Sequence, residues 1–106
     1  EVPPPQVAAN LAAMVDVLRY EYAARPARIV ISTPCYDYWP GAEARLEAYS
    51  EEIRRLVAAR GLRPGPDFFA AYATQRDLYY GSDPVHPNLA GMDRMADLWA
   101  RALCYP

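Results

Sequence analysis

Residues 28–33 contain the feature that most constrains the fold, three consecutive β-branched side chains at Ile29, Val30 and Ile31. Such a run has no polar face, so it suits a strand that is covered on both sides, as in a parallel sheet. Pro34 ends the run because it lacks a backbone N–H. The sequence therefore predicts a buried parallel strand at residues 28–33.

Segments with helical periodicity flank this strand. Their apolar side chains recur every three or four positions, which places them on one face of a helix. After an extended leader at residues 1–6, the expected elements are a helix at 7–24, the strand at 28–33, a helix at 42–60 that ends at Gly61, a short strand at 67–72 and a last helix at 87–103. This alternation favours an α/β fold with parallel strands.

The apolar face of each helix is expected to lie in the core. The expected buried positions are Val7, Leu11, Met14, Val15, Leu18 and Tyr22 in the first helix, Leu46, Tyr49, Ile53, Leu56 and Val57 in the second, and Met92, Met95, Ala96, Trp99, Ala102 and Leu103 in the last. The methionines and the tryptophan of the last helix are interpreted as core residues and not as a cofactor site.

Two strands are few for a chain of this length. The 106 residues are enough for one small domain, and hydrophobic residues make up 53% of them, which excludes a disordered chain. Two parallel strands alone leave the sheet edges bare, so another polypeptide segment is expected to cover them. We therefore expect residues 1–106 to be the C-terminal segment of a single domain that an N-terminal half completes.

Charge and hydropathy argue against two classes of function. The net charge is −2, from scattered charges of both signs without a basic stripe, so nucleic-acid binding is not expected. No apolar run reaches the length of a transmembrane helix. The first residues have neither an initiator methionine nor the parts of a signal peptide, which fits a processed N-terminus or a proteolytic nick. We expect an extracellular or cell-envelope location, with the cytoplasm as the alternative.

The segment with the clearest chemistry is residues 83–91, which contains the only histidine, His86, three positions after Asp83. Histidine can accept and return a proton near neutral pH, and a carboxylate on one ring nitrogen fixes its tautomer and orientation. A tight turn at Pro84 can bring the two side chains together, and Pro87 suits the first position of a helix. This pairing predicts that His86 is the base and Asp83 the acid of a catalytic triad. The alternative is a turn aspartate that caps a helix beside a solvated histidine.

This segment resembles the last block of the SGNH (GDSL-type) hydrolases, in which an Asp-x-x-His-Pro sequence, often continued by Asn and Gly, supplies the acid and base of a Ser-His-Asp triad. Asp83 and His86 match those two positions. Residues 28–34 look like the fourth strand of that family, and residues 67–72 occupy the place of the fifth. The resemblance implies the C-terminal part of a three-layer α/β/α, flavodoxin-like fold with parallel strands.

The nucleophile and the oxyanion donors of that family have no counterpart in this chain. The Gly-Asp-Ser block and the Gly-x-Asn block that supply them would lie upstream of it. Ser32 and Ser50 fall within predicted elements, and Ser82 adjoins the acid instead of approaching the opposite ring nitrogen. Cys35, just past a strand end, stays as a remote alternative nucleophile. The resemblance thus implies that an N-terminal half of the same enzyme supplies the serine and the oxyanion hole.

Aromatic residues follow the first strand and precede the acid. The loop after the strand holds Tyr36, Tyr38 and Trp39, and ligands of open α/β sheets bind outside the carboxyl ends of the strands. Tyr79 and Tyr80 precede the acid by a few positions. All five rings are candidate substrate-binding residues. The alternatives are that the loop rings only pack under the loop or against a partner, and that the later tyrosines shield the acid from water.

Cys35 and Cys104 are not expected to form a disulfide with each other. The first follows the carboxyl end of a strand, whereas the second ends a helix that runs away from that edge for about 15 residues, or roughly 22 Å. A bridge requires Cα atoms within about 7 Å. A lone histidine without a second histidine or a nearby cysteine is poor material for zinc, so neither a metal nor another cofactor is expected.

Together these features predict a serine ester hydrolase, of the esterase or lipase type, that acts on small acyl esters. This chain would supply His86 and Asp83. An O-acyltransferase is one alternative, because it differs only in the acceptor of the acyl group. From a different class, the chain is a non-catalytic α/β binding module, or a truncated remnant whose histidine has no nucleophile to serve.

Overall fold

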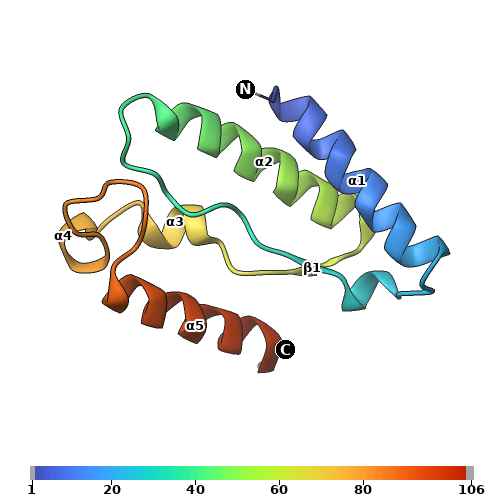
Figure 1. Ribbon diagram of the computed structural model, residues 1–106. Coiled ribbons are helices and arrows are strands. Elements are labelled where there is room, and N and C mark those ends of the chain that lie inside the picture. The colour runs from blue at the N-terminus through green and yellow to red at the C-terminus, as the bar shows by residue number, and fades with distance from the viewer. Residues whose placement is uncertain (1, 105–106) are drawn as a thin grey trace.

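The described chain begins with a helix, a strand, a helix and a strand, as expected, but both strands are short and helices α3, α4 and α5 follow the second one (Figure 1). The computed structural model describes residues 2–104, so Glu1, which the predicted leader includes, lies outside the described residues. In chain order the elements are α1 (Pro4–Tyr20), the 3-10 helix η1 (Pro26–Arg28), β1 (Val30–Ile31), α2 (Ala42–Arg60), β2 (Arg63–Pro64), α3 (Phe68–Tyr72), α4 (Arg76–Tyr79) and α5 (Leu89–Cys104). No helix in the described range is both long and apolar enough to cross a membrane. The fold is mixed α/β and mostly helical.

The two strands pair in parallel, with Val30 opposite Arg63 and Ile31 opposite Pro64. α2 connects them, because parallel strands require a crossover from the end of one strand to the start of the next. β1 is shorter than the strand predicted at residues 28–33, and no third strand pairs with it within residues 2–104. The bonds to β1 come from the N–H groups of Arg63 and Gly65, so Pro64 is tolerated between them. Figure 1 shows α1 and α2 on one side of the strand pair and α5 on the other.

The prediction of a strand at residues 67–72 is wrong, because most of this segment forms helix α3. Asp67 is the N-cap of α3, and its side chain accepts a hydrogen bond from the Ala70 N–H at 3.1 Å. Aspartate is favoured at this position, and Ala70 and Ala71 add helix propensity. The second strand lies earlier in the chain, at β2.

α1 starts and ends earlier than predicted. Pro4 and Pro5 lie in its first turn, where backbone N–H groups have no intrahelical partner, so residues expected to be extended are helical. Near the other end, Ala23 has a φ of 56°, and the Ala24 N–H donates to the Leu18 carbonyl at 2.9 Å. This left-handed turn ends the helix before the proline that was expected to stop it.

The other two long helices lie close to their predicted bounds. α2 covers the predicted range, and its C-cap Gly61 has a φ of 64°. α5 begins at Leu89 instead of Pro87, because the side chain of Asn88 caps it. Pro87 pairs with Tyr80 in an isolated antiparallel bridge, so its predicted place at the first helical position is wrong.

The interior consists of two clusters of buried side chains. The first, formed by α1, α2 and residues next to the strands, is aliphatic and comprises Val15, Ile29, Ile53, Val57 and Leu62. The second is aromatic and comprises Tyr36, Phe68, Tyr72 and Tyr80, with residues of α5 packed against it. The aromatic cluster lies beyond the carboxyl end of β1, next to the segment that carries the histidine.

Part of the expected core is exposed. In and after α1, the side chains of Met14, Leu18 and Tyr22 face solvent, and in α5 so do those of Met92, Ala96 and Leu103. The prediction that these residues are buried is wrong for the described part of the chain. Their apolar faces have no second layer to pack against within residues 2–104.

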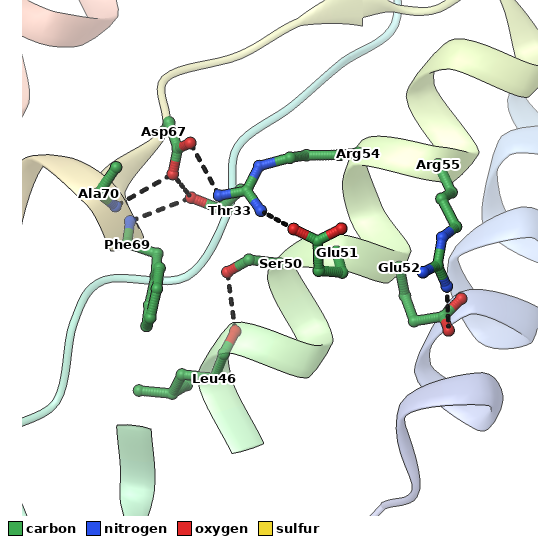
Figure 2. A network of polar contacts seen from close by, with 10 residues as sticks. All are labelled: Thr33, Leu46, Ser50, Glu51, Glu52, Arg54, Arg55, Asp67, Phe69 and Ala70. Carbon is green, nitrogen blue, oxygen red and sulfur yellow. Dashed lines mark hydrogen bonds and ion pairs between the residues drawn. The ribbon is translucent and has the colours of Figure 1, made fainter. Parts of the chain in front are cut away.

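A polar network joins the end of β1 to the start of α3 (Figure 2). The Thr33 hydroxyl donates to Asp67 Oδ1 at 2.9 Å and accepts a hydrogen bond from the Phe69 N–H at 3.1 Å. Arg54, on α2, donates to Asp67 Oδ2 at 2.9 Å and to Glu51 at 2.8 Å. One carboxylate thereby joins three segments at the carboxyl end of the strands.

These contacts hold the pKa of the Asp67 carboxyl below its ordinary value. Partial burial favours the neutral form, but hydrogen bonds from the Ala70 N–H, Arg54 and Thr33 outweigh it. Since the pKa is lower in the folded state than in the unfolded state, the carboxylate stabilises the fold above the unfolded-state pKa. This contribution is lost as the pH falls through the folded-state pKa.

We predict that Asp67→Ala lowers the free energy of unfolding by about 1 kcal/mol at about pH 7, the usual cost of a lost N-cap. The difference between the variant and the wild type shrinks as the pH is lowered to about 2, because the wild-type carboxyl takes up a proton as the pH falls toward its folded-state pKa. Urea unfolding followed by circular dichroism at both pH values measures the two differences. Asp93→Ala, at an exposed position within α5, is the control and should cause no comparable loss. A difference that is the same at both pH values would contradict the assignment.

Candidate active site

The predicted acid and base lie on a closed loop between α4 and α5. The antiparallel bridge between Tyr80 and Pro87 brings together the two ends of the loop, residues 81–86. From outside the loop, the Tyr38 N–H donates to the Pro84 carbonyl at 2.9 Å. The segment that follows β1 therefore contacts the segment that carries the histidine.

The two oxygens of the Asp83 carboxylate have different partners. Oδ1 accepts hydrogen bonds from the Val85 N–H at 2.8 Å and from the His86 N–H at 3.2 Å, which forms an Asx turn. Oδ2 lies 2.8 Å from Nδ1 of the His86 ring. One oxygen holds the turn and the other binds the ring. The predicted contact between the two side chains is confirmed, while their catalytic role stays a prediction.

The ring of His86 is bound at one nitrogen and open at the other. An ionised carboxylate only accepts hydrogen bonds, so Nδ1 carries the proton and donates it to Asp83. Nε2 has no hydrogen-bond partner among residues 2–104, and the histidine side chain is 79% exposed. In the neutral ring with its proton on Nδ1, Nε2 can therefore accept a proton from a group that approaches from outside the loop.

The pKa of the Asp83 carboxyl is below its ordinary value. The hydrogen bond from the Val85 N–H is the largest cause, and the bond from the His86 ring is the next. Both donors favour the charged form of the carboxyl. Asp83 is thus ionised at neutral pH, which is the state that can orient an imidazole and stabilise its protonated form.

The alternative interpretation of residues 83–91, a turn aspartate that caps a helix beside a solvated histidine, agrees with the exposure of the histidine but not with the helix cap. His86 is indeed mostly solvated, and Tyr79 and Tyr80 do not shield the acid, because the Asp83 side chain is 53% exposed. Asp83 does not cap the helix, however. The N-cap of α5 is Asn88, and the aspartate is engaged with the turn and the ring.

The five candidate substrate-binding rings lie in different environments. Tyr36 and Tyr80 are buried, and the Tyr80 hydroxyl donates to the Tyr36 carbonyl. Tyr38 is half-buried and its hydroxyl donates to a carbonyl of α3, and Tyr79 is also half-buried. Trp39 is 61% exposed. The four tyrosines build the support of the loop, and the tryptophan is the ring presented to solvent.

No hydroxyl or thiol within residues 2–104 is bonded to the imidazole. Ser50 is fully buried and donates to a carbonyl of its own helix at 2.8 Å. Ser32 is half-buried, and Ser82 is exposed on the side of the acid. Cys35 is half-buried, and burial raises the pKa of its thiol, which lowers the fraction of reactive thiolate. The local alternatives to an external serine are therefore weak.

The site offers no evident position for a metal. Within the described range, no three His, Cys, Asp or Glu side chains are grouped so that they could hold an ion.

Cys35 and Cys104 are both free thiols, the first half-buried and the second exposed.

Two contacts of the site have no signal in the sequence. The guanidinium carbon of Arg76 lies 5.2 Å from the centre of the Tyr38 ring, and the backbone of Tyr38 binds the loop at Pro84. These partners are far apart along the chain, so no local spacing predicts them. The cap at Asn88 did have a signal, an asparagine directly before an apolar helix, which the assignment of Pro87 to the first helical position overlooks.

Comparisons with known proteins add no assignment. No known protein family, curated protein or solved structure matches this chain. A functional proposal therefore depends on the motif and on the geometry of its loop.

We predict that His86→Ala raises the pKa of the Asp83 carboxyl but leaves it below the ordinary value. The variant removes the ring that donates to Oδ2 and keeps the Val85 N–H, which is the larger cause. Titration of the carboxyl carbon by 13C NMR measures this pKa. The carboxyl of Asp67 is the internal control, because its donors are Ala70, Arg54 and Thr33. An unchanged Asp83 pKa would show that the ring contact is absent in solution.

Proposed function

We propose that this chain supplies the base and the acid of a serine ester hydrolase of the SGNH type. The observation that carries the proposal is the 2.8 Å contact between Asp83 Oδ2 and His86 Nδ1, with Nε2 left open and outward. This is the arrangement by which an aspartate holds a histidine in the tautomer needed to accept a proton from a serine. The Asp-x-x-His-Pro sequence supports the same assignment.

In the proposed reaction, His86 Nε2 takes the proton of a serine hydroxyl as its oxygen attacks the acyl carbon. The same nitrogen then gives that proton to the leaving alcohol, and the acyl group stays on the serine. A water molecule next attacks the acyl carbon, and its proton passes through the same nitrogen to the serine oxygen as the acid is released. Asp83 keeps the ring in place and stabilises its protonated form. The developing oxyanion requires donors that we assign, with the serine, to an N-terminal segment.

Three observations support the participation of that segment. The imidazole has no nucleophile among residues 2–104, β1 has one neighbouring strand, and apolar side chains of α1 and α5 are exposed. A segment that pairs with β1 and covers these helix faces would extend the strand pair into the parallel sheet of a three-layer, flavodoxin-like domain. It would also exclude water from the loop, which strengthens the electrostatic contacts there.

Aromatic residues beside the loop are the proposed walls of the ester site. Trp39 is exposed one residue after Tyr38, whose backbone binds the loop at Pro84. An indole ring in this place can pack against the apolar part of an acyl ester. The proposed substrates are therefore small esters with an apolar group. Tyr36 and Tyr80 are assigned to the support of the site.

We predict that a fluorophosphonate, a reagent that reacts with activated serines, labels the protein isolated from its source on a serine outside residues 1–106. Denaturing gels and intact mass show which polypeptide carries the label, and peptide mapping locates the serine. His86→Ala, introduced in the native gene, should abolish the labelling because the hydroxyl then has no base. Labelling that persists in this variant, or that falls on Ser32, Ser50 or Ser82, contradicts the proposal.

For hydrolysis of short p-nitrophenyl esters by the same preparation, we predict losses in kcat of about 10⁶-fold for His86→Ala and about 10⁴-fold for Asp83→Asn. The asparagine variant loses less because it keeps the imidazole, which His86→Ala removes, and loses only the carboxylate that holds the ring in the required tautomer. Asp93→Asn makes the same chemical change on α5 and should retain wild-type turnover. Adding a small alcohol distinguishes a hydrolase, which releases mainly the acid, from an acyltransferase, which releases mainly the new ester. Wild-type turnover in His86→Ala would refute the assignment of the base.

A further inference from the structure

Asn88 follows loop 81–86 and forms hydrogen bonds with both flanking helices. Its backbone N–H donates to the Tyr79 carbonyl at 2.8 Å, and its side-chain amide donates to the Leu78 carbonyl at 3.1 Å. Its side-chain oxygen accepts from the Gly91 N–H at 2.8 Å. One residue thus joins the end of α4 to the start of α5, directly after the loop that carries Asp83 and His86.

The packing around Asn88 leaves little room for movement. Gly91 is buried, and a Cβ atom there would lie 2.5 Å from the Tyr79 carbonyl oxygen and 2.6 Å from Cβ of Pro87. The hydroxyl of Tyr72 donates to the Gly91 carbonyl. Burial raises the pKa of this hydroxyl to about 12, so it remains a donor at neutral pH. The close approach of α5 to the end of α4 requires a residue without a side chain at position 91.

The Asp83–His86 contact needs such external support. Both side chains are more than half exposed, at 53% and 79%. Water competes for exposed hydrogen bonds of this kind, and exposed ion pairs contribute little to stability. The persistence of the contact therefore also depends on the backbone that brings the two residues together, and hydrogen bonds hold this backbone where the loop begins and ends.

We infer that Asn88 is a positioning residue for the Asp83–His86 pair, acting by joining the two ends of loop 81–86. The amide donor to the Leu78 carbonyl is the part of Asn88 that serves this role, and the side-chain oxygen is the part that caps α5. The effect on catalysis rests on the proposed hydrolase function. The effect on the geometry of the pair does not.

The variant Asn88→Ser separates the role of the side-chain amide from that of the capping oxygen. Serine at an N-cap still offers an oxygen to the N–H of the third helical residue but has no amide to donate to Leu78. If Asn88 were only a helix cap, Asn88→Ser would leave the loop unchanged. Asn10→Ser is the matched control, because Asn10 lies on α1 and its side chain is bonded to Gln6.

The measurement reads the ring of His86, whose NMR signals are identified as those that His86→Ala removes. Correlation of the ring protons with the ring nitrogens by 1H–15N NMR reports the fraction of the imidazole that carries its proton on Nδ1. Asp83→Ala, which removes the carboxylate, gives the value for a ring that is no longer held. We expect Asn88→Ser to move this fraction at least about half of the way to the Asp83→Ala value, and Asn10→Ser to leave it at the wild-type value.

Gly91→Ala tests the same junction by a different route. Alanine favours a helix more than glycine does, so the substitution alone should not weaken α5. Its Cβ would push α5 away from the Tyr79 carbonyl. We expect the tautomer fraction to shift as in Asn88→Ser while the far-ultraviolet circular dichroism keeps its wild-type helical signal. A tautomer fraction that stays at the wild-type value in both variants overturns the inference.

Ester turnover by the assembled protein then shows whether the positioning matters for catalysis. We expect Asn88→Ser to lower kcat by about tenfold or more with little change in KM, because a misplaced base affects the chemical step. A shifted tautomer in a protein that hydrolyses no ester supports the positioning role and refutes the hydrolase. An active enzyme in which Asn88→Ser changes neither the tautomer nor kcat supports the hydrolase and refutes the positioning role.

Discussion

The parallel pairing of β1 with β2 is the constraint on which the rest of the structure depends. Parallel strands run in the same direction, so the segments that follow them both begin at the carboxyl end of the pair. The aromatic loop after β1 and the segment from α3 to α5 therefore begin at the same end of the molecule. The bonds of Asp67 to Thr33 and Arg54 fix that end, and the aromatic cluster fills the space beyond it.

Residues outside the Asp83–His86 pair contribute to the geometry of the candidate site. Asp83 and His86 are both largely exposed, and their mutual contact is one that water can replace. The scaffold restricts them instead, through the Tyr80–Pro87 bridge and the contact of Tyr38 with the loop. Catalysis by such a pair requires a nucleophile and the exclusion of water, and in the proposed enzyme an N-terminal segment supplies both.

The sequence predicted the helices better than the strands because helices depend on local periodicity and caps. α2 follows its apolar spacing and ends at Gly61 as expected. A strand depends on a partner elsewhere in the chain, and the pairing of Val30 with Arg63 has no local signal. Residues 67–72 contain the aromatic residues typical of a strand, yet Asp67 in a capping position and two alanines favour α3. Burial also depends on partners, which is why Met14, Leu18 and Met92 were predicted inside and lie outside.

For the site, the amino-acid sequence specifies the chemical identity of the pair and its spacing, because three positions across a proline-containing turn are short enough for a carboxylate to reach an imidazole. The folded structure adds that one oxygen of Asp83 binds the ring while the other binds the turn. It also decided that Tyr36 and Tyr80 are interior supports while Trp39 is exposed. Local spacing fixes contacts between neighbours in the chain, whereas exposure and orientation depend on segments that meet only after folding.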